Sequence, residues 1–250
     1  MSALLISRRN LLYPMLFFLC MGTKISSGSE VFDDFLEGGY EKDMLSTIYG
    51  PAGSGKTTLC MLAAIAQARE KRKIIYVDTE GGFSMERFAQ LAGGDTERLL
   101  PYLILLKPTS FQEQNDALKK LVGLVNEKIG LIVVDTLTIF YRLELSGKAD
   151  FKATNNLLIW QVNYLIEIAR KHLIPVLATN QVYADFENRQ EVRMVGGDIL
   201  RNRSKCIIEL RKGAENRREA RIVTHRSIPE DKRLPFAIIN AGLVKVEEVE

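Results

Sequence analysis

The stretch Gly50-Pro51-Ala52-Gly53-Ser54-Gly55-Lys56-Thr57 decides how the rest of the chain folds. It has glycine, lysine and threonine at every fixed position of the phosphate-binding loop G-x-x-x-x-G-K-[ST]. The apolar run Leu45 to Tyr49 precedes it, and a helix-like run from Thr58 to Glu70 follows. A buried strand, a glycine loop and a helix N-terminus in this order direct backbone N–H groups and the helix dipole at a polyphosphate. The stretch therefore predicts a nucleotide-binding α/β protein.

The residues of this loop have separate predicted roles toward ATP and Mg²⁺. The three glycines let the backbone close around the phosphates, Lys56 reaches the β and γ phosphates, and the Thr57 hydroxyl ligates Mg²⁺. A solvent-exposed turn of glycine and serine is the alternative, which the strand and helix on either side disfavour. We expect the ATP site to include Gly50, Pro51, Ala52, Gly53, Ser54, Gly55, Lys56, Thr57 and Thr58.

Two more strands end in polar residues that we expect beside the nucleotide, because ligands bind at the carboxyl ends of parallel strands. The strand from Lys73 is followed by Asp78 and Glu80, and Gly81-Gly82 come next. The apolar run after Gly130 ends at Asp135, which would hold the Mg²⁺ shell opposite Thr57.

A third strand, Ile174 to Thr179, is followed by Asn180-Gln181. A glutamine at a strand tip can sense the γ-phosphate or orient the attacking water. A simple loop amide is the alternative for Gln181.

The composition is that of an ordinary globular protein. Of the 250 residues 46% are hydrophobic and 26% charged, and the formal charge of +3 is too small to indicate a nucleic-acid partner by itself. Cys20, Cys60 and Cys206 are scattered without C-x-x-C spacing, and the two histidines are isolated. Neither a disulfide framework nor a zinc site is therefore indicated, and a reducing cytoplasm fits.

Residues 1–20 resemble the first part of a secretory signal peptide, since Arg8-Arg9 precede the apolar run Leu11 to Cys20. The run is too short to span a bilayer comfortably. An ATP-dependent protein fits the cytoplasm better, so we expect translation to start at Met21 and residues 1–20 to be an over-extended gene model. A membrane anchor is the alternative. Residues 21–250 are then expected to form one ATPase core domain.

The other segments complete an α/β pattern. A helix over residues 31–36, a strand over 102–106 and helices over 110–128 and 155–172 are predicted from apolar spacing and caps. The polar segments 140–154 and 183–194 are predicted to be loops. After residue 205, strands over 206–210, 220–224 and 235–240 alternate with polar turns, which favours antiparallel strands appended to the sheet. We expect a mostly parallel twisted sheet with helices on both faces and C-terminal antiparallel strands.

In their order these motifs resemble the RecA-type recombinase family, in its archaeal and eukaryotic branch. The resemblance covers about residues 21–248 and implies a RecA-like P-loop ATPase core. Asp-Thr-Glu-Gly and Thr-Asn-Gln-Val in this order are far more specific than the P-loop alone. The segments that carry it are the P-loop, Tyr76 to Phe83 with Glu86-Arg87, Leu131 to Asp135, Thr179 to Val182, Gly196 to Leu200 and Leu210 to Gly213.

The resemblance also implies roles for single residues. Glu80 is the general base or water-positioning carboxylate, acting with Lys56, and Gln181 links the ATP state to the adjacent DNA-binding loop. Arg87 resembles a residue that packs near the adenine. The segments 142–152 and 183–195 take the places of the two DNA-binding loops. The DNA contacts expected are Arg142, Lys148, Lys152, Tyr183, Arg189, Arg193, Arg201 and Arg203.

The chemistry of the residues gives the DNA expectation some independent support. Tyr183, Phe186, Arg189 and Arg193 combine ring faces with cations, a composition suited to single strands. Cations also crowd residues 201–226, where a stripe on one face would neutralise phosphates, and a solvated strand edge is the alternative. These cations are Arg201, Arg203, Lys205, Arg211, Lys212, Arg217, Arg218, Arg221 and Arg226.

Departures from the recombinase pattern narrow the function that the resemblance implies. The sequence has no Phe-x-x-Ala, has Asp198 where recombinases usually have histidine, and has only a short segment before the core. This architecture resembles the archaeal RadB paralogues, which implies an accessory role in recombination and repair, binding to single-stranded or branched DNA, very weak ATPase activity and no strand exchange. Recombinase or junction-processing proteins would be partners, a homo-oligomer is possible, and no membrane is involved. The alternatives are a DNA-stimulated, filament-forming recombinase and a KaiC-like regulatory ATPase without DNA binding.

Overall fold

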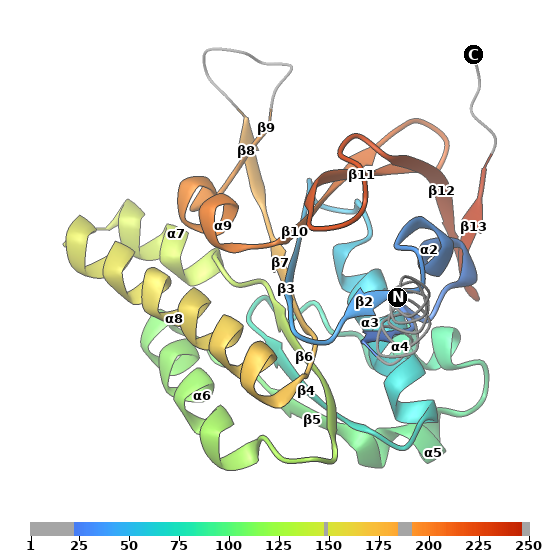
Figure 1. Cartoon of the computed structure of the whole chain (residues 1–250), viewed down its shortest axis with the longest axis horizontal. Helices are drawn as coiled ribbons and strands as arrows, with labels where there is room; N and C mark the ends of the chain where they lie inside the picture. The colour runs from blue at the N-terminus through green and yellow to red at the C-terminus, as the bar shows by residue number, and fades with distance from the viewer. Residues whose placement is uncertain (1–22, 148–149, 185–191, 247–250) are drawn as a thin grey trace, which may run out of the picture.

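The computed structural model describes residues 23–147, 150–184 and 192–246 (Figure 1). Within these residues one sheet has nine strands in the order β13-β12-β11-β10-β3-β7-β6-β4-β5. Its strands are β3 Leu45–Tyr49, β4 Lys73–Asp78, β5 Leu103–Leu106, β6 Ile129–Asp135, β7 Val176–Asn180, β10 Cys206–Lys212, β11 Arg217–His225, β12 Arg233–Ile239 and β13 Gly242–Lys245.

Helices cover both faces of this sheet (Figure 1). On one side lie α2 Glu30–Phe35, α3 Lys56–Arg69, α4 Met85–Ala92 and α5 Thr96–Leu99, which continues into the 3-10 turn η1 Leu100–Tyr102. On the other lie α6 Phe111–Leu124, α7 Ile139–Ser146, α8 Phe151–His172 and α9 Gly197–Arg203. In the described ranges no helix has both the length and the apolar composition needed to cross a membrane.

The alternation of side chains along the strands explains why a hydrophobic core lies on each face of the sheet. In β4, Ile74 and Tyr76 belong to the core under α3 and α4, whereas Ile75 and Val77 belong to the core under α6 and α8. Side chains of a strand point alternately to opposite faces, so a continuous apolar run is buried on both sides. The apolar runs predicted as strands form the centre of the sheet for this reason.

The neighbouring strands from β10 to β5 are parallel, so their carboxyl ends meet at one edge. Tyr49 at the end of β3 is opposite Asn180 at the end of β7, and Asp78 of β4 is opposite Asp135 of β6. This register brings the P-loop and the polar strand ends together. The predicted fold class, a mostly parallel sheet between helices with antiparallel C-terminal strands, is confirmed.

The expectation for the C-terminal strands was wrong for the first of them. β10 is parallel to β3, with Cys206 opposite Ser46, and the antiparallel part begins only with β11. The chain reaches β10 through α9, and a parallel partner requires such a crossover rather than a tight turn. β11 and β12 are antiparallel as predicted, and β13, which the sequence did not predict, pairs antiparallel with β12.

The predicted loop over residues 140–154 is also wrong, because most of it is helical. Helix α7 buries Phe140 and Tyr141 in the core under α6 and α8. Helix α8 begins at Phe151 rather than Asn155, and the Asp150 side chain accepts hydrogen bonds from the first-turn N–H groups. The polar residues that suggested a loop lie on the outer face of α7 and at this cap.

The predicted loop over residues 183–194 includes the two arms of a hairpin. β8 Val182–Ala184 pairs antiparallel with β9 Val192–Met194, and Figure 1 shows this pair projecting from the sheet edge beside α9. A further small sheet joins β1 Lys24–Ile25 to β2 Tyr40–Glu41.

Candidate functional site

A cavity of about 360 Å³ lies where the P-loop meets the carboxyl ends of β4, β6 and β7. The sequence predicted most of its wall, but not Thr136 or the contributions from β11 and β12. The cavity is lined by Ala52, Gly53, Gly55, Lys56, Thr57, Thr58, Glu80, Asp135, Thr136, Gln181, Arg218 and Ile238.

Close packing of the P-loop backbone explains its glycines. Gly55 has a φ of 107°, and a Cβ there would lie 2.8 Å from Cδ1 of Ile238. A Cβ on Gly50 would lie 2.3 Å from the carbonyl oxygen of Leu210. The loop thus passes directly under β10 and β12, where only glycine fits. It leads into α3, whose N-terminal N–H groups suit an anionic polyphosphate.

Lys56 is buried at the start of α3, where its ammonium group donates to loop carbonyls. Its Nζ lies 2.8 Å from the oxygen of Gly50 and 3.0 Å from that of Pro51. Burial lowers the pKa of Lys56, while the nearby carboxylates of Asp135 and Glu80 act in the opposite direction. The lysine is therefore a positioned cation at the helix N-terminus, as phosphate binding requires.

Asp135 is fixed by two buried hydroxyl groups. The Tyr76 hydroxyl donates to Oδ2 at 2.8 Å, and the Thr179 hydroxyl donates to Oδ1. Burial, together with the charge of Asp135, raises the pKa of Tyr76 well above its usual value, so this hydroxyl keeps its proton. The Asp135 carboxylate and the Thr57 hydroxyl line the same cavity. Oxygen donors of this kind fit Mg²⁺, most simply through water on the aspartate side.

Glu80 and Gln181 are hydrogen bonded to each other at the mouth of the cavity. Oε1 of Glu80 accepts from Nε2 of Gln181 at 2.8 Å and from the Thr136 hydroxyl at 2.7 Å. The other oxygen, Oε2, has no hydrogen-bond partner within the described part of the chain. A carboxylate held in this way can present one oxygen to a water molecule.

Asp78 does not face the nucleotide cavity, and that prediction was wrong. The residue is buried, and its carboxylate accepts from the backbone N–H groups of Gly82 and Phe83 at 3.0 and 3.2 Å. Asp78 therefore shapes the turn that follows β4. Because Asp78 fixes this turn, Glu80, which lies between Asp78 and Gly82 in the chain, is held at the cavity.

Arg87 lies outside the cavity wall, in the first turn of α4. Its guanidinium donates to the carbonyl oxygens of Ile239 at 2.8 Å and Asn240 at 3.3 Å. It thus ties α4 to the end of β12, next to the cavity-lining Ile238. Whether it also contacts a base stays a prediction.

Three cavity residues were missed by the sequence reasoning: Thr136, which directly follows β6, Arg218 of β11 and Ile238 of β12. The Nε of Arg218 donates to the carbonyl oxygen of Gly53 at 3.1 Å. Ile238 gave no chemical signal in the sequence, and Arg218 was one of many cations in its segment. Only the order of the strands in the sheet brings Arg218 and Ile238 against the P-loop.

Part of the basic stripe expected over residues 201–226 is engaged in contacts within the protein. Arg211 and Arg221 both form ion pairs with the buried Glu209, at 3.0 and 2.8 Å. Arg226 pairs with Glu41 and Asp43. With Arg218 at the P-loop, these four arginines are not a free phosphate-binding stripe. Arg201 and Arg203 instead lie in the last turn of α9, where Arg203 also contacts Asn163.

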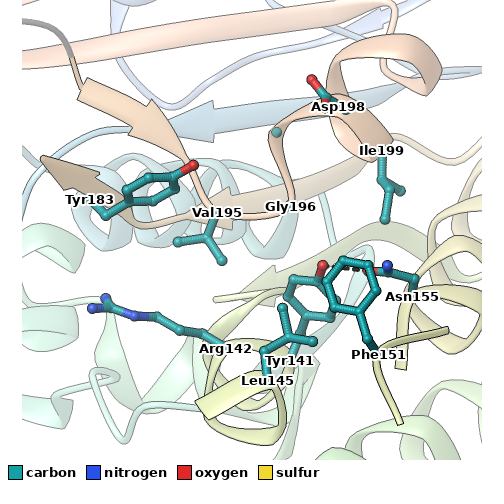
Figure 2. A pocket seen from close by; sticks show the side chains of 11 residues that line it. Tyr141, Arg142, Leu145, Phe151, Asn155, Tyr183, Val195, Gly196, Asp198 and Ile199 are labelled. Carbon is teal, nitrogen blue, oxygen red and sulfur yellow. Dashed lines mark hydrogen bonds between the residues drawn. The ribbon is translucent and has the colours of Figure 1, made fainter. Parts of the chain in front are cut away.

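A second cavity, of about 540 Å³, lies between α7, the start of α8, the base of the hairpin and α9 (Figure 2). Its rings are Tyr141, Phe151 and Tyr183, and Phe151 and Tyr183 are 65% and 40% exposed. Figure 2 shows the Arg142 side chain on the same side as Tyr183, while the Asp198 carboxylate points away from the rings. The cavity thus offers exposed aromatic faces beside a cation.

The other expected DNA contacts either do not line this cavity or are not described. Lys152 is exposed in the first turn of α8. Lys148 and Arg189 lie outside the described residues, and of Arg193 only its backbone pairing with Tyr183 is described.

Comparison with known proteins places the chain in a family. The model of the Rad51 family matches residues 21–246. The DNA repair and recombination protein RadB of Methanobrevibacter smithii is 38% identical over 229 residues, covering 88% of this chain and 95% of that protein. RadB of Methanoculleus marisnigri is 40% identical over 224 residues, covering 88% and 97%. A crystal structure of the RadB recombinase is 34% identical with a TM-score of 0.76, covering 89% of this chain and 100% of that one. The chain therefore belongs to the Rad51 family and has the RecA-like α/β fold.

Proposed function

We propose that this protein binds ATP with Mg²⁺, binds single-stranded or branched DNA, and acts as an accessory protein of homologous recombination and DNA repair in the cytoplasm. ATP hydrolysis is very weak, and strand exchange is not part of its activity. Family membership supports this, as do the relatives, which are named as DNA repair and recombination proteins. Recombinases or junction-processing proteins as partners of this chain, and a homo-oligomer, belong to the same proposal.

The observation that carries the proposal is the hydrogen bond between Glu80 and Gln181, because it connects the two cavities. Gln181 lines the nucleotide cavity and directly precedes β8. Its carbonyl oxygen accepts from the N–H of Val195 at 3.2 Å, and Val195 lines the aromatic cavity. A change at Glu80 that accompanies nucleotide binding would therefore move the base of the hairpin. Such coupling needs only a difference in nucleotide affinity between two arrangements.

At the nucleotide cavity, the chain binds and orients more than it reacts. The P-loop N–H groups, Lys56 and the start of α3 would hold the phosphates, and Thr57 and Asp135 would hold Mg²⁺. When bound, the metal neutralises charge on the phosphates and on the transferring group. Oε2 of Glu80 would accept a hydrogen bond from the attacking water. The fixed position of Glu80 supports this role.

At the aromatic cavity, stacking and charge would bind DNA. Phe151 and Tyr183 expose ring faces on which bases stack, and Arg142 supplies a cation for a phosphate. Stacking of one base on an aromatic side chain contributes about 1–3 kcal/mol. This chemistry favours unpaired bases, which single-stranded and branched DNA both offer.

Fluorescence anisotropy tests the proposal with a labelled single-stranded oligonucleotide, with and without ATP and at two salt concentrations, while ATP hydrolysis is followed in the same samples. We expect salt-sensitive binding and little DNA-stimulated hydrolysis. Phe151→Ala should weaken binding by about fivefold or more, since one stacking platform is lost. Val122→Ala is the matched control, because Val122 is exposed on α6, away from both cavities.

The outcomes distinguish the alternatives. Strong DNA stimulation of hydrolysis would favour an active recombinase. Absence of DNA binding at low salt would contradict both DNA roles and favour a regulatory ATPase. The coupling between the two cavities is tested with Gln181→Ala, which removes the hydrogen bond to Glu80. This variant should bind DNA with the same affinity whether or not ATP is present.

A further inference from the structure

Arg218 reaches the P-loop from a strand that is distant in sequence. Its Nε donates to Gly53 at 3.1 Å, and Nη1 donates to the backbone oxygen of Asn216 at 2.7 Å. Its side chain also lies over the start of α3, since a Cβ on Gly55 would be 3.9 Å from Cδ of Arg218. Arg218 is thus a wall residue of the nucleotide cavity.

The guanidinium keeps hydrogen-bonding capacity for a ligand. Of its five N–H groups, the two on Nη2 have no acceptor within the described residues. Arg218 also forms no ion pair there, unlike Arg211, Arg221 and Arg226. A partly buried arginine without a carboxylate partner, facing a cavity, is suited to an anion.

Strand alternation gives Arg218 and its neighbour different environments. Ala220 and Ile222 are buried in the core under α3 and α4, so residues 218, 220 and 222 face that side. Arg217 faces the opposite side and is exposed. Of these two adjacent arginines, Arg218 therefore lies at the nucleotide cavity and Arg217 in solvent.

We propose that Arg218 binds the polyphosphate of the nucleotide, as a second cation beside Lys56, and thereby holds β11 and β12 over the P-loop. This inference rests on the proposed function, of which it specifies one binding contact. Two cations and two carboxylates, Glu80 and Asp135, then surround a site for a polyphosphate and a divalent cation. Nucleotide binding would fix the C-terminal strands through the same side chain.

Titration with a fluorescent ATP analogue and Mg²⁺ tests the proposal in the full chain, followed by displacement with inorganic tripolyphosphate. Arg218→Gln should raise the Kd for the analogue about tenfold or more, since a hydrogen bond to a charged group is lost. Its affinity for tripolyphosphate should fall in parallel. Arg217→Gln, the matched control, should stay within twofold of the wild type. DNA affinity without nucleotide should be unchanged in Arg218→Gln.

A second measurement uses the wild-type protein and does not depend on a variant that folds. An arginine-specific dicarbonyl reagent, read out by mass spectrometry, should modify Arg218 more slowly when Mg²⁺ and ATP are present, whereas Arg217 should react at the same rate. Equal nucleotide affinity of Arg218→Gln and the wild type, or unchanged modification of Arg218, would overturn the inference and leave the proposed function intact. If the wild type bound no nucleotide, both this inference and the proposed function would fail.

Discussion

Removing the hydroxyl of Tyr76 tests how Asp135, the aspartate proposed to hold Mg²⁺, is kept in position. The hydroxyl is fully buried and donates to Oδ2 of Asp135 at 2.8 Å. Tyr76→Phe keeps the ring and its edge contact with Phe83, whose centroid is 5.0 Å away, so the change is confined to one hydrogen bond. A hydrogen bond to a charged group contributes about 1.5–3 kcal/mol. We expect the free energy of unfolding to fall by this amount.

Urea unfolding at pH 7 measures this change, with the slope against urea expected to be unchanged. For a domain of this size, 1 kcal/mol corresponds to about 2–4 °C in Tm, so the variant should melt about 3–12 °C lower. The stabilisation by Mg²⁺ and ATP should also decrease, because Asp135 is less firmly oriented. Tyr102→Phe is the control, since Tyr102 is half-buried and its hydroxyl has no hydrogen bond within the described residues. A Tyr76→Phe variant within about 0.5 kcal/mol of the wild type would refute the reasoning.

Three further predictions concern the P-loop, the turn after β4 and a buried histidine. Gly55→Ala should abolish the rise in Tm caused by Mg²⁺ and ATP, because the φ of 107° strains any residue with a Cβ and that Cβ would also meet Cδ1 of Ile238 at 2.8 Å. Gly93→Ala, at a φ of 64° and in open space, should lose only about 1 kcal/mol and keep that rise. A normal nucleotide response of the Gly55 variant would contradict the packing argument. Asp78→Ala should lower the free energy of unfolding by about 2 kcal/mol, because the N–H groups of Gly82 and the buried Phe83 lose their acceptor. Urea unfolding that shows no loss of stability would contradict the role of Asp78 in holding this turn. The His225 side chain is 2% exposed, and burial lowers its pKa below the usual value of 6.5. The unfolded state therefore binds the proton first, so stability should fall as the pH drops from about 6.5 toward the folded-state pKa, and His225→Asn should show a smaller fall in urea unfolding between pH 7 and pH 5. An identical pH dependence of the two proteins would exclude this histidine as the cause.

Local patterns were sufficient for the central fold and for much of the candidate site. The spacing of glycine, lysine and threonine defines the P-loop, and unbroken apolar runs define strands buried on both faces. Since the carboxyl ends of parallel strands share one edge, the sequence alone predicts Glu80, Asp135 and Gln181 beside Lys56. The structure places all four at one cavity.

The same local reasoning failed where polar residues have tertiary partners. Asp78 looked like a site residue because it ends a strand, yet it accepts from two backbone N–H groups. The segment 140–154 looked like a loop because it is polar, yet its buried rings and the cap at Asp150 form helices. In both cases hydrogen bonding and burial, which composition does not report, decided the outcome.

By itself, the sequence determined the nucleotide-binding loop, the parallel strands and the side chains at their ends, because these depend on residues close together along the chain. Only the tertiary structure decided which of the C-terminal arginines are paired with carboxylates and which one faces the P-loop. Arg218 and Gly53 are 165 positions apart, and the order β11-β10-β3 in the sheet brings them into contact. Sheet order and register depend on packing between distant segments, so no local pattern could have singled out that arginine.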